Sequence, residues 1–177
     1  MPTTPLLALD AAVIDTETTG LDPSKARVVE IAAVRLVTGR IDPDRTFHCL
    51  VRPDVPIPPA ASAVHRIDDA MVSAAAPFDK AWSEAIAFLR GLPLIGHSLG
   101  FDFAVIKREC ERTGLTFDLP PSLDTQLLAQ VVAPNLAGYS LEQLTTWLEI
   151  DVVDRHSALG DAMTTARIFK ALVPKLR

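Results

Sequence analysis

The sequence predicts an α/β fold in which helices cover a sheet of mixed antiparallel and parallel strands. Three β-rich segments come first, at residues 11–15, 28–37 and 46–51. Helical and strand-like segments then alternate to the end of the chain. Strands that follow one another directly pair as an antiparallel meander, whereas strands that return after a helix pair in parallel, so one sheet is expected to contain both.

The first three strands are apolar runs that turn signals separate. AAVID, residues 11–15, ends in an acid, and the turn-rich TETTGLDPS follows it. VVEIAAVRLV and TFHCLV are mostly apolar and β-branched, and TGRIDP between them is a turn signal. The proline-rich PDVPIPP, residues 53–59, is expected to leave the sheet as a loop, because proline lacks the N–H that a strand ladder needs.

The later elements are predicted from helical periodicity, caps and stops. Apolar residues recur at every third or fourth position from Phe78 to Leu89. Gly114 ends a helix, SLEQ begins another with a capping box, and Pro174 stops the last one. Helices are therefore expected at 78–89, 101–113, 125–132, 140–148 and 158–172, with short strands at 92–95 and 122–124.

Length and composition favour one globular domain over residues 1–177, since 49% of the residues are hydrophobic and no low-complexity tract interrupts them. The formal net charge of -5 argues against a protein that holds nucleic acid mainly by coating its phosphates with lysine and arginine. It does not exclude an enzyme that grips a phosphate through bound cations, because the ligands of those cations are themselves acidic.

The cysteines and the N-terminus bear on location. Cys49 and Cys110 show no CxxC spacing, which argues against a structural zinc site. A disulfide between them stays open, although two isolated cysteines are more typical of buried thiols in a reducing compartment. No basic residue precedes Lys25, as a signal peptide would require, and no apolar run approaches the roughly 18 residues of a membrane span. We expect a cytoplasmic protein without a membrane partner.

Acidic residues mark two junctions between the expected elements, where functional residues are often presented. DTETTG places Asp15 and Glu17 two residues apart at a strand end, hence on one face. They repel each other there unless a cation lies between them, and the alternative is a solvated pair in a turn. HSLGFD places Asp102 in the first turn of a helix, a position that the helix dipole also explains.

A third motif, HSALGD, carries His156 and Asp161. Five steps along a helix would set the two side chains about 140° apart, so the histidine is expected in the loop before the helix, facing the aspartate from there. A lone histidine is more often a surface residue or a hydrogen-bonded core residue. The ordered combination of all three motifs is the stronger signal.

In order and spacing, DTETTG, HSLGFD and HSALGD resemble the motifs of the DEDDh (DnaQ-like) 3′-to-5′ exonucleases, a family that includes the proofreading subunit of the bacterial replicative polymerase and ribonuclease T. VVEIAAVRLV resembles the second strand of that family and AVHRIDDAMV its pocket-lining loop. The resemblance extends roughly from Leu9 to Leu172. It implies a ribonuclease H-like fold, a five-stranded mixed sheet whose first three strands are antiparallel, flanked by helices.

The resemblance also implies roles. Asp15 would bridge two divalent cations, Glu17 and Asp161 would hold the cation on the water side, and Asp102 would support the other mainly through water. His156 would be the general base. Oxygen ligands without cysteine suit magnesium or manganese. Two such cations can clamp an in-line displacement at phosphorus. The expected reaction releases nucleoside 5′-monophosphates from the 3′ end of single-stranded nucleic acid, with DNA favoured.

Five residues are expected to bind the substrate by the same resemblance: Thr18, Gly20, Leu21, His65 and Phe101. Backbone amides after the first acid would recognise the terminal 3′-hydroxyl. Leu21 would be a wedge against the base stack, and His65 and Phe101 would line the pocket of the terminal base. For these three side chains, ordinary packing is the alternative.

Three further positions qualify the resemblance. Asp124 matches a common family aspartate but is expected to be a helix cap or a supporting acid rather than a ligand. Ser98 stands where the family usually has asparagine, which leaves the carboxylates intact. Arg66 stands where glycine is usual, and it can add a phosphate contact or narrow the pocket, so the preferred substrate stays open.

Two other functions remain open from the sequence. One is an exoribonuclease that acts on short RNA. The other is a non-catalytic polymerase-accessory module, which usually lacks one of the five catalytic groups, whereas none is missing here. The expected partners are 3′ ends of single-stranded DNA or RNA, with a polymerase as a further candidate. The chain ends shortly after the last expected helix, which favours a stand-alone enzyme or another tether.

Overall fold

The computed structural model describes residues 5–152 and 154–176. At its centre lies a six-stranded sheet with the order β4-β3-β2-β1-β5-β6. The strands are β1 (Ala11–Thr18), β2 (Val28–Val37), β3 (Arg40–Arg52), β4 (Ala76–Pro77), β5 (Leu94–Gly96) and β6 (Ser122–Asp124). The helices are α1 (Pro59–His65), α2 (Asp69–Val72), α3 (Phe78–Leu89), α4 (Leu99–Thr113), α5 (Thr125–Val132), α6 (Leu141–Leu148) and α7 (Ala158–Leu172), with 3-10 turns at Leu6–Ala8 and Val173–Lys175.

The pairing of the strands confirms the predicted fold class. β2 pairs antiparallel with both β1 and β3, whereas the β1–β5, β5–β6 and β3–β4 pairs are parallel. The sheet has six strands instead of the five expected, because Ala76–Pro77 adds to the edge of β3. A two-residue strand that contains a proline carries no strand pattern in the sequence, and proline is tolerated there because the position is an edge.

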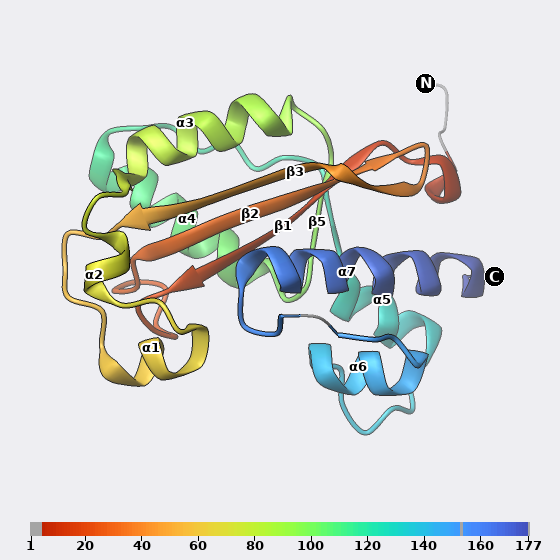
Figure 1. Cartoon of the computed structure of the whole chain (residues 1–177). Helices are drawn as coiled ribbons and strands as arrows, with labels where there is room; N and C mark the ends of the chain where they lie inside the picture. The colour runs from red at the N-terminus through yellow and green to blue at the C-terminus, as the bar shows by residue number, and fades with distance from the viewer. Residues whose placement is uncertain (1–4, 153, 177) are drawn as a thin grey trace.

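Both faces of the sheet are covered, which follows from the alternation of side chains along β1. Ala12 and Ile14 belong to a core that α3 and α4 complete on one face. Ala11 and Val13 belong to a second core with Phe169 of α7 on the other face. Figure 1 shows α7 in front of the sheet and α4 behind it. The end of β1 therefore emerges between two helical layers.

The predicted bounds of β2, β6, α3, α5 and α7 are confirmed, and those of β5, α4 and α6 differ by one or two residues. Three other predictions are corrected. β1 continues through Thr18 rather than turning after Asp15. β3 begins at Arg40, because the tight turn is confined to Thr38–Gly39 and the strand passes Pro43 where its register with β2 shifts. Residues 63–72, expected as a pocket-lining loop, lie largely in α1 and α2. The loop expected at 53–59 ends where α1 begins at Pro59, since proline fits the first turn of a helix.

Both cysteines are free thiols, Cys110 buried and Cys49 half-buried. Within residues 5–152 and 154–176, no helix combines the length and apolar character required to cross a bilayer.

Candidate active site

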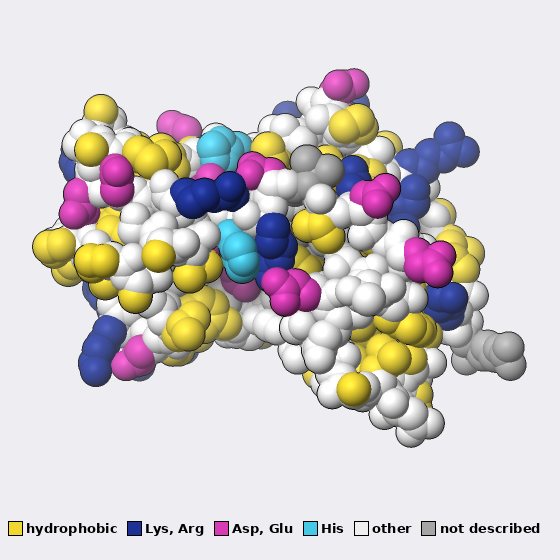
Figure 2. Space-filling view, turned by 60° about the horizontal axis from the view of Figure 1, so that its bottom comes forward, with side chains coloured by type: hydrophobic (Ala, Val, Ile, Leu, Met, Phe, Trp, Pro, Cys, Tyr) yellow, Lys and Arg dark blue, Asp and Glu magenta, His cyan; other side chains and the backbone are white. Residues whose placement is uncertain are grey.

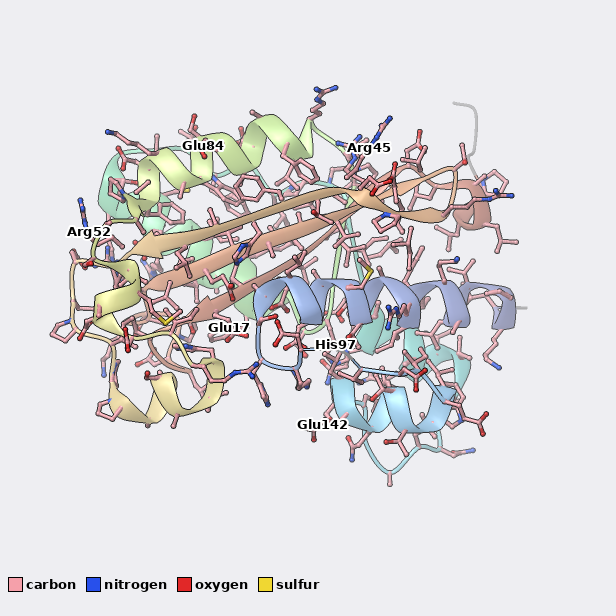
Figure 3. The ribbon with its side chains drawn as sticks, in the orientation of Figure 1. Glu17, Arg45, Arg52, Glu84, His97 and Glu142 are labelled. Atoms are coloured by element: carbon pink, nitrogen blue, oxygen red, sulfur yellow. The ribbon has the colours of Figure 1, made fainter. Side chains whose placement is uncertain are left out.

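Three carboxylates converge where β1 ends and α7 begins. Asp15 and Glu17 come from β1, and Asp161 comes from the first turn of α7. One oxygen atom from each lies within 4.8 Å of the others. Figure 3 shows Glu17 beside the N-terminal end of α7. The alternation along β1 thus directs both of its acids to one face, as the i, i+2 spacing predicts.

Asp102 approaches the same strand from α4. Its carboxylate is buried, and Thr16 Oγ1 donates a hydrogen bond of 2.6 Å to its Oδ1. Its charge is close enough to raise the pKa of Asp15. Asp102 lies outside the group of three oxygens within 4.8 Å. It is therefore a fourth acid at the flank of the cluster.

Asp124 positions Asp102 indirectly by capping two helices. Its carboxylate accepts from the N–H groups of Ser98 (3.1 Å) and Leu99 (2.9 Å) at the start of α4, and of Gln126 (2.8 Å) in α5. The predicted cap is thus confirmed. Ser98 has a φ of 57°, in the left-handed region that asparagine tolerates better than most residues.

The N-terminus of α7 is fixed to the sheet by Glu30, a residue that sequence reasoning missed. Glu30 Oε2 accepts from the Ala158 N–H at 2.7 Å, and Glu30 Oε1 lies 2.5 Å from His48 Nε2. Glu30 sits directly opposite Glu17 in the β1–β2 ladder. The hydrogen bond between Glu30 and the Ala158 N–H fixes the start of α7. It therefore sets the position of Asp161, which lies three residues after Ala158.

His156 lies in the loop before α7, as the spacing predicts, because the helix begins at Ala158. It is half-buried, and its backbone has a φ of 63°. Burial raises the pKa of Asp161, and Arg155 and, after it, His156 oppose that rise. The carboxyl of Asp161 and the imidazole of His156 are therefore close enough to interact electrostatically.

The acids of the cluster are electrostatically crowded. Burial raises the pKa of Asp15 well above its usual value, and Asp102, Asp161 and Glu17 raise it further. Burial, with a smaller effect of Asp161, raises the pKa of Glu17 to about 7. Burial likewise raises the pKa of Asp102 to about 7. Groups this close cannot all be ionised without a positive charge among them.

Part of that positive charge comes from Arg155, which sequence reasoning also missed. Its guanidinium forms an ion pair with Asp161 Oδ2 and opposes the rise in the pKa of Asp15 and Glu17. Asp161 Oδ1 is buried without a hydrogen-bond partner among the described residues. An unpartnered carboxylate oxygen in a cluster of oxygen donors fits a divalent cation such as Mg²⁺ or Mn²⁺.

A hollow of about 550 Å³ opens beside the acids. Its lining comprises Asp15, His97, Ser98, Gln126, Tyr139, Ser140, Leu141, Gln143, Arg155 and Asp161. Figure 2 shows histidine, arginine and acidic side chains gathered across the middle of this face. His97, the first residue of HSLGFD, also lines the hollow, which its motif alone does not indicate. Its Nδ1 lies 3.0 Å from Thr125 Oγ1, and its Nε2 is buried without a partner among the described residues.

The expected substrate-binding residues lie around the end of β1. Thr18 is buried, and its Oγ1 donates to the Gly20 carbonyl at 2.8 Å. Leu21 is 91% exposed, which rules out core packing for that side chain. His65 is buried at the end of α1, and burial lowers its pKa, an effect that the backbone of Thr18 opposes. Phe101 is half-buried against the α3–α4 core, so packing accounts for part of its surface.

Comparisons with known proteins relate the chain to exonucleases. A family model described as exonuclease matches residues 12–169. The chain is 42% identical over 177 residues to a DNA polymerase III subunit epsilon-like protein of Rhodobacter capsulatus, a match that covers 98% of this chain and 25% of that protein. It is 31% identical to the DNA polymerase III subunit epsilon of Rickettsia typhi, with 93% of this chain and 74% of that protein covered.

Among solved structures, exonuclease X in complex with 5′-overhanging duplex DNA has a TM-score of 0.74 to this chain at 30% identity, and the match covers 92% of this chain and 90% of that one. The chain spans a quarter or less of the length of several of its relatives. The matched region contains Asp15, Asp102 and Asp161.

Proposed function

This chain belongs to the DnaQ-like 3′-to-5′ exonuclease family, and we propose that it is a metal-dependent enzyme that removes nucleoside 5′-monophosphates from the 3′ end of single-stranded DNA. The observation that carries the proposal is the convergence of one carboxylate oxygen each from Asp15, Glu17 and Asp161 to within 4.8 Å. Among the described residues, Arg155 forms an ion pair with Asp161 of this group. Residues 1–177 would act as one exonuclease domain.

Four carboxylates would hold two divalent cations, Mg²⁺ or Mn²⁺. Asp15 would bridge both, with Glu17 and Asp161 on one side and Asp102 on the other. When bound, such cations activate water and stabilise the charge that develops at phosphorus and on the leaving oxygen. Thr16 supports this arrangement by holding Asp102 through its 2.6 Å hydrogen bond, and Glu30 supports it by fixing the start of α7.

His156 would move the proton. Imidazole is the side chain best suited to accept a proton from water near neutral pH. His156 is half-buried in the loop that leads into Asp161, so it can face the water side of the cluster while remaining in contact with solvent. The proton taken from the attacking water would then pass to solvent.

The end of β1 would hold the terminal nucleotide. Backbone amides at Glu17 and Thr18 would recognise the 3′-hydroxyl, and the exposed Leu21 would insert beside the terminal base. His65 and Phe101 would flank that base. DNA is the proposed substrate because exonuclease X, 30% identical to this chain, was solved in complex with duplex DNA carrying a 5′ overhang.

Digestion of 5′-labelled single-stranded DNA and RNA of equal sequence, in Mg²⁺ or Mn²⁺, tests the proposal. We expect stepwise shortening of the DNA with release of 5′-monophosphates, and no shortening by Asp15→Asn. Faster shortening of RNA than of DNA would make the enzyme an exoribonuclease. If neither substrate were shortened by the unaltered chain, the proposed activity would be refuted.

A further inference from the structure

We propose that Arg155 is a substrate-contacting residue of this site, paired with Asp161 until a cation occupies that carboxylate and then turned to the phosphate of the nucleotide that is cleaved. This assignment rests on the proposed exonuclease function and adds a residue to the same site.

The position of Arg155 is the first reason. Its side chain is 29% exposed and ion-paired with Asp161, which is 6% exposed. It lines the same hollow as Asp15 and His97. Its Nε is buried and has no hydrogen-bond partner among the described residues. The guanidinium is thus only partly satisfied and borders the space that a substrate phosphate would enter.

Charge balance is the second reason. Four carboxylates and two divalent cations together form a neutral centre, whereas a phosphodiester carries one negative charge. A guanidinium at the rim supplies the matching positive charge. Arginine also presents a planar set of donors that fits two phosphate oxygens at once. When a cation neutralises Asp161, the attraction that holds Arg155 to that carboxylate weakens, and the phosphate becomes the better partner.

The backbone of Arg155 is held by a residue at the end of α1, which is the third reason. Arg66 at the end of α1 donates to the Arg155 carbonyl at 2.7 Å and to Asp154 Oδ1 at 3.1 Å. The flanking residues Asp154 and His156 both have positive φ, 54° and 63°. Arg66 itself has a φ of 64°, a conformation that glycine adopts freely. Because its guanidinium holds the Arg155 carbonyl and the neighbouring Asp154, Arg66 acts as a positioning residue for Arg155.

Two titrations of the purified chain test the assignment, with Arg155→Gln as the variant. The first measures Mn²⁺ binding by calorimetry without nucleotide. The second measures binding of deoxyadenosine 5′-monophosphate to the Mn²⁺-loaded protein. We expect Arg155→Gln to bind Mn²⁺ more tightly, because a competitor for Asp161 is gone, and the nucleotide about tenfold more weakly, because a charge-assisted contact is lost. Arg155→Lys should lie between.

Arg167→Gln is the matched control, because Arg167 donates to the Asp151 carbonyl at 2.8 Å and so holds the same segment from α7. It should leave both affinities unchanged. Weaker binding of both ligands by Arg155→Gln would make Arg155 a support for Asp161 and overturn the assignment, as would two unchanged affinities. If the unaltered chain bound neither ligand, the exonuclease proposal itself would fall, and this assignment with it.

Discussion

Two buried acidic regions of this molecule differ in how their charges are balanced. Glu109 in α4 is 1% exposed, and its Oε1 accepts from Arg27 Nε at 2.9 Å and from the Val28 N–H at 3.0 Å. Arg112 approaches its other oxygen at 3.8 Å. Arg27 also pairs with the exposed Asp54, so in this region two arginines meet two acids. At the end of β1 four acids, Asp15, Glu17, Asp102 and Asp161, lie near one arginine, Arg155.

This difference in charge balance distinguishes a structural acid, Glu109, from acids whose charge a bound ligand can balance. A buried carboxylate with its own cations stabilises the fold relative to the same carboxylate left alone. A buried cluster with excess negative charge opposes folding unless it binds cations from solution. The excess charge at the end of β1 therefore indicates function more clearly than the acidic residues themselves do.

Asp15→Asn should separate activity from stability most strongly. We expect exonuclease activity to fall more than about 1000-fold, because both proposed cations lose a shared ligand. The metal-free melting temperature should stay the same or rise, because a buried acid among three others becomes neutral. Thermal melts in chelator, alongside digestion of labelled DNA, would check both. A large fall in melting temperature would instead make Asp15 a structural residue like Glu109.

Glu109→Gln should show the opposite behaviour. Removing one member of a buried ion pair leaves Arg27 with only the exposed Asp54 as its acidic partner, and we expect the free energy of unfolding to fall by about 3 kcal/mol. Activity per folded molecule should be retained, since α4 still presents Asp102. Urea unfolding followed by circular dichroism measures the first quantity. An unchanged midpoint would show that the two acidic regions do not differ in the way described.

The pH dependence of stability should also distinguish the two regions. Folding raises the pKa of Glu17 and of Asp102 to about 7. A carboxyl whose pKa rises on folding favours the folded state while it is protonated. Its stabilising contribution is therefore complete below the unfolded pKa and is lost as the pH rises toward 7.

The contribution of the site to metal-free stability should thus fall between about pH 4.5 and about pH 7, and the gain in melting temperature on adding Mn²⁺ should grow over the same range. Melts in chelator and in Mn²⁺ across this range provide the test. Glu17→Gln should flatten the metal-free profile. A profile identical to that of the unaltered chain would contradict the raised pKa of Glu17.

The smallest expected effect concerns the loop that carries Arg155 and His156. Glycine adopts the left-handed backbone of residue 66 without the strain of a side chain. Arg66→Gly should therefore leave the free energy of unfolding unchanged or raise it by up to about 1 kcal/mol. Activity should nevertheless fall, by roughly tenfold, because the loop loses its contact with α1. Arg90→Gly is the matched control, since Arg90 ends α3 with a φ of 51°. It should lose the same backbone strain and leave activity unchanged. Equal activity of the two variants would remove the positioning role of Arg66.

Local patterns explain which parts of this fold were predictable. The bounds of β2, α3 and α7 were predicted correctly because strand and helix periodicity and stops such as Pro174 depend on only a few neighbouring residues. The convergence of Asp15 and Glu17 followed from strand alternation, and Asp161 from a motif at a helix start. The roles of the ten proposed site residues, and the cytoplasmic location and polymerase partner, stay predictions.

Contacts between distant segments explain what was missed. Glu30 caps a helix 128 residues away, and Arg66 reaches the backbone 89 residues further along, so no local pattern could reveal either contact. Arg155 directly precedes His156 of the HSALGD motif, but only the folded structure shows that its guanidinium pairs with Asp161. β4 was missed because two residues of an edge strand leave no periodicity to detect.

Anomalous diffraction from crystals grown with Mn²⁺ and deoxyadenosine 5′-monophosphate would test the central claim most directly. We predict two anomalous peaks per chain, one bounded by Asp15, Glu17 and Asp161 and the other by Asp15 and Asp102, with the nucleotide phosphate between them. Peaks located elsewhere, or an acidic cluster that stays free of manganese while the nucleotide binds, would contradict the claim that these carboxylates form a cation-dependent exonuclease centre.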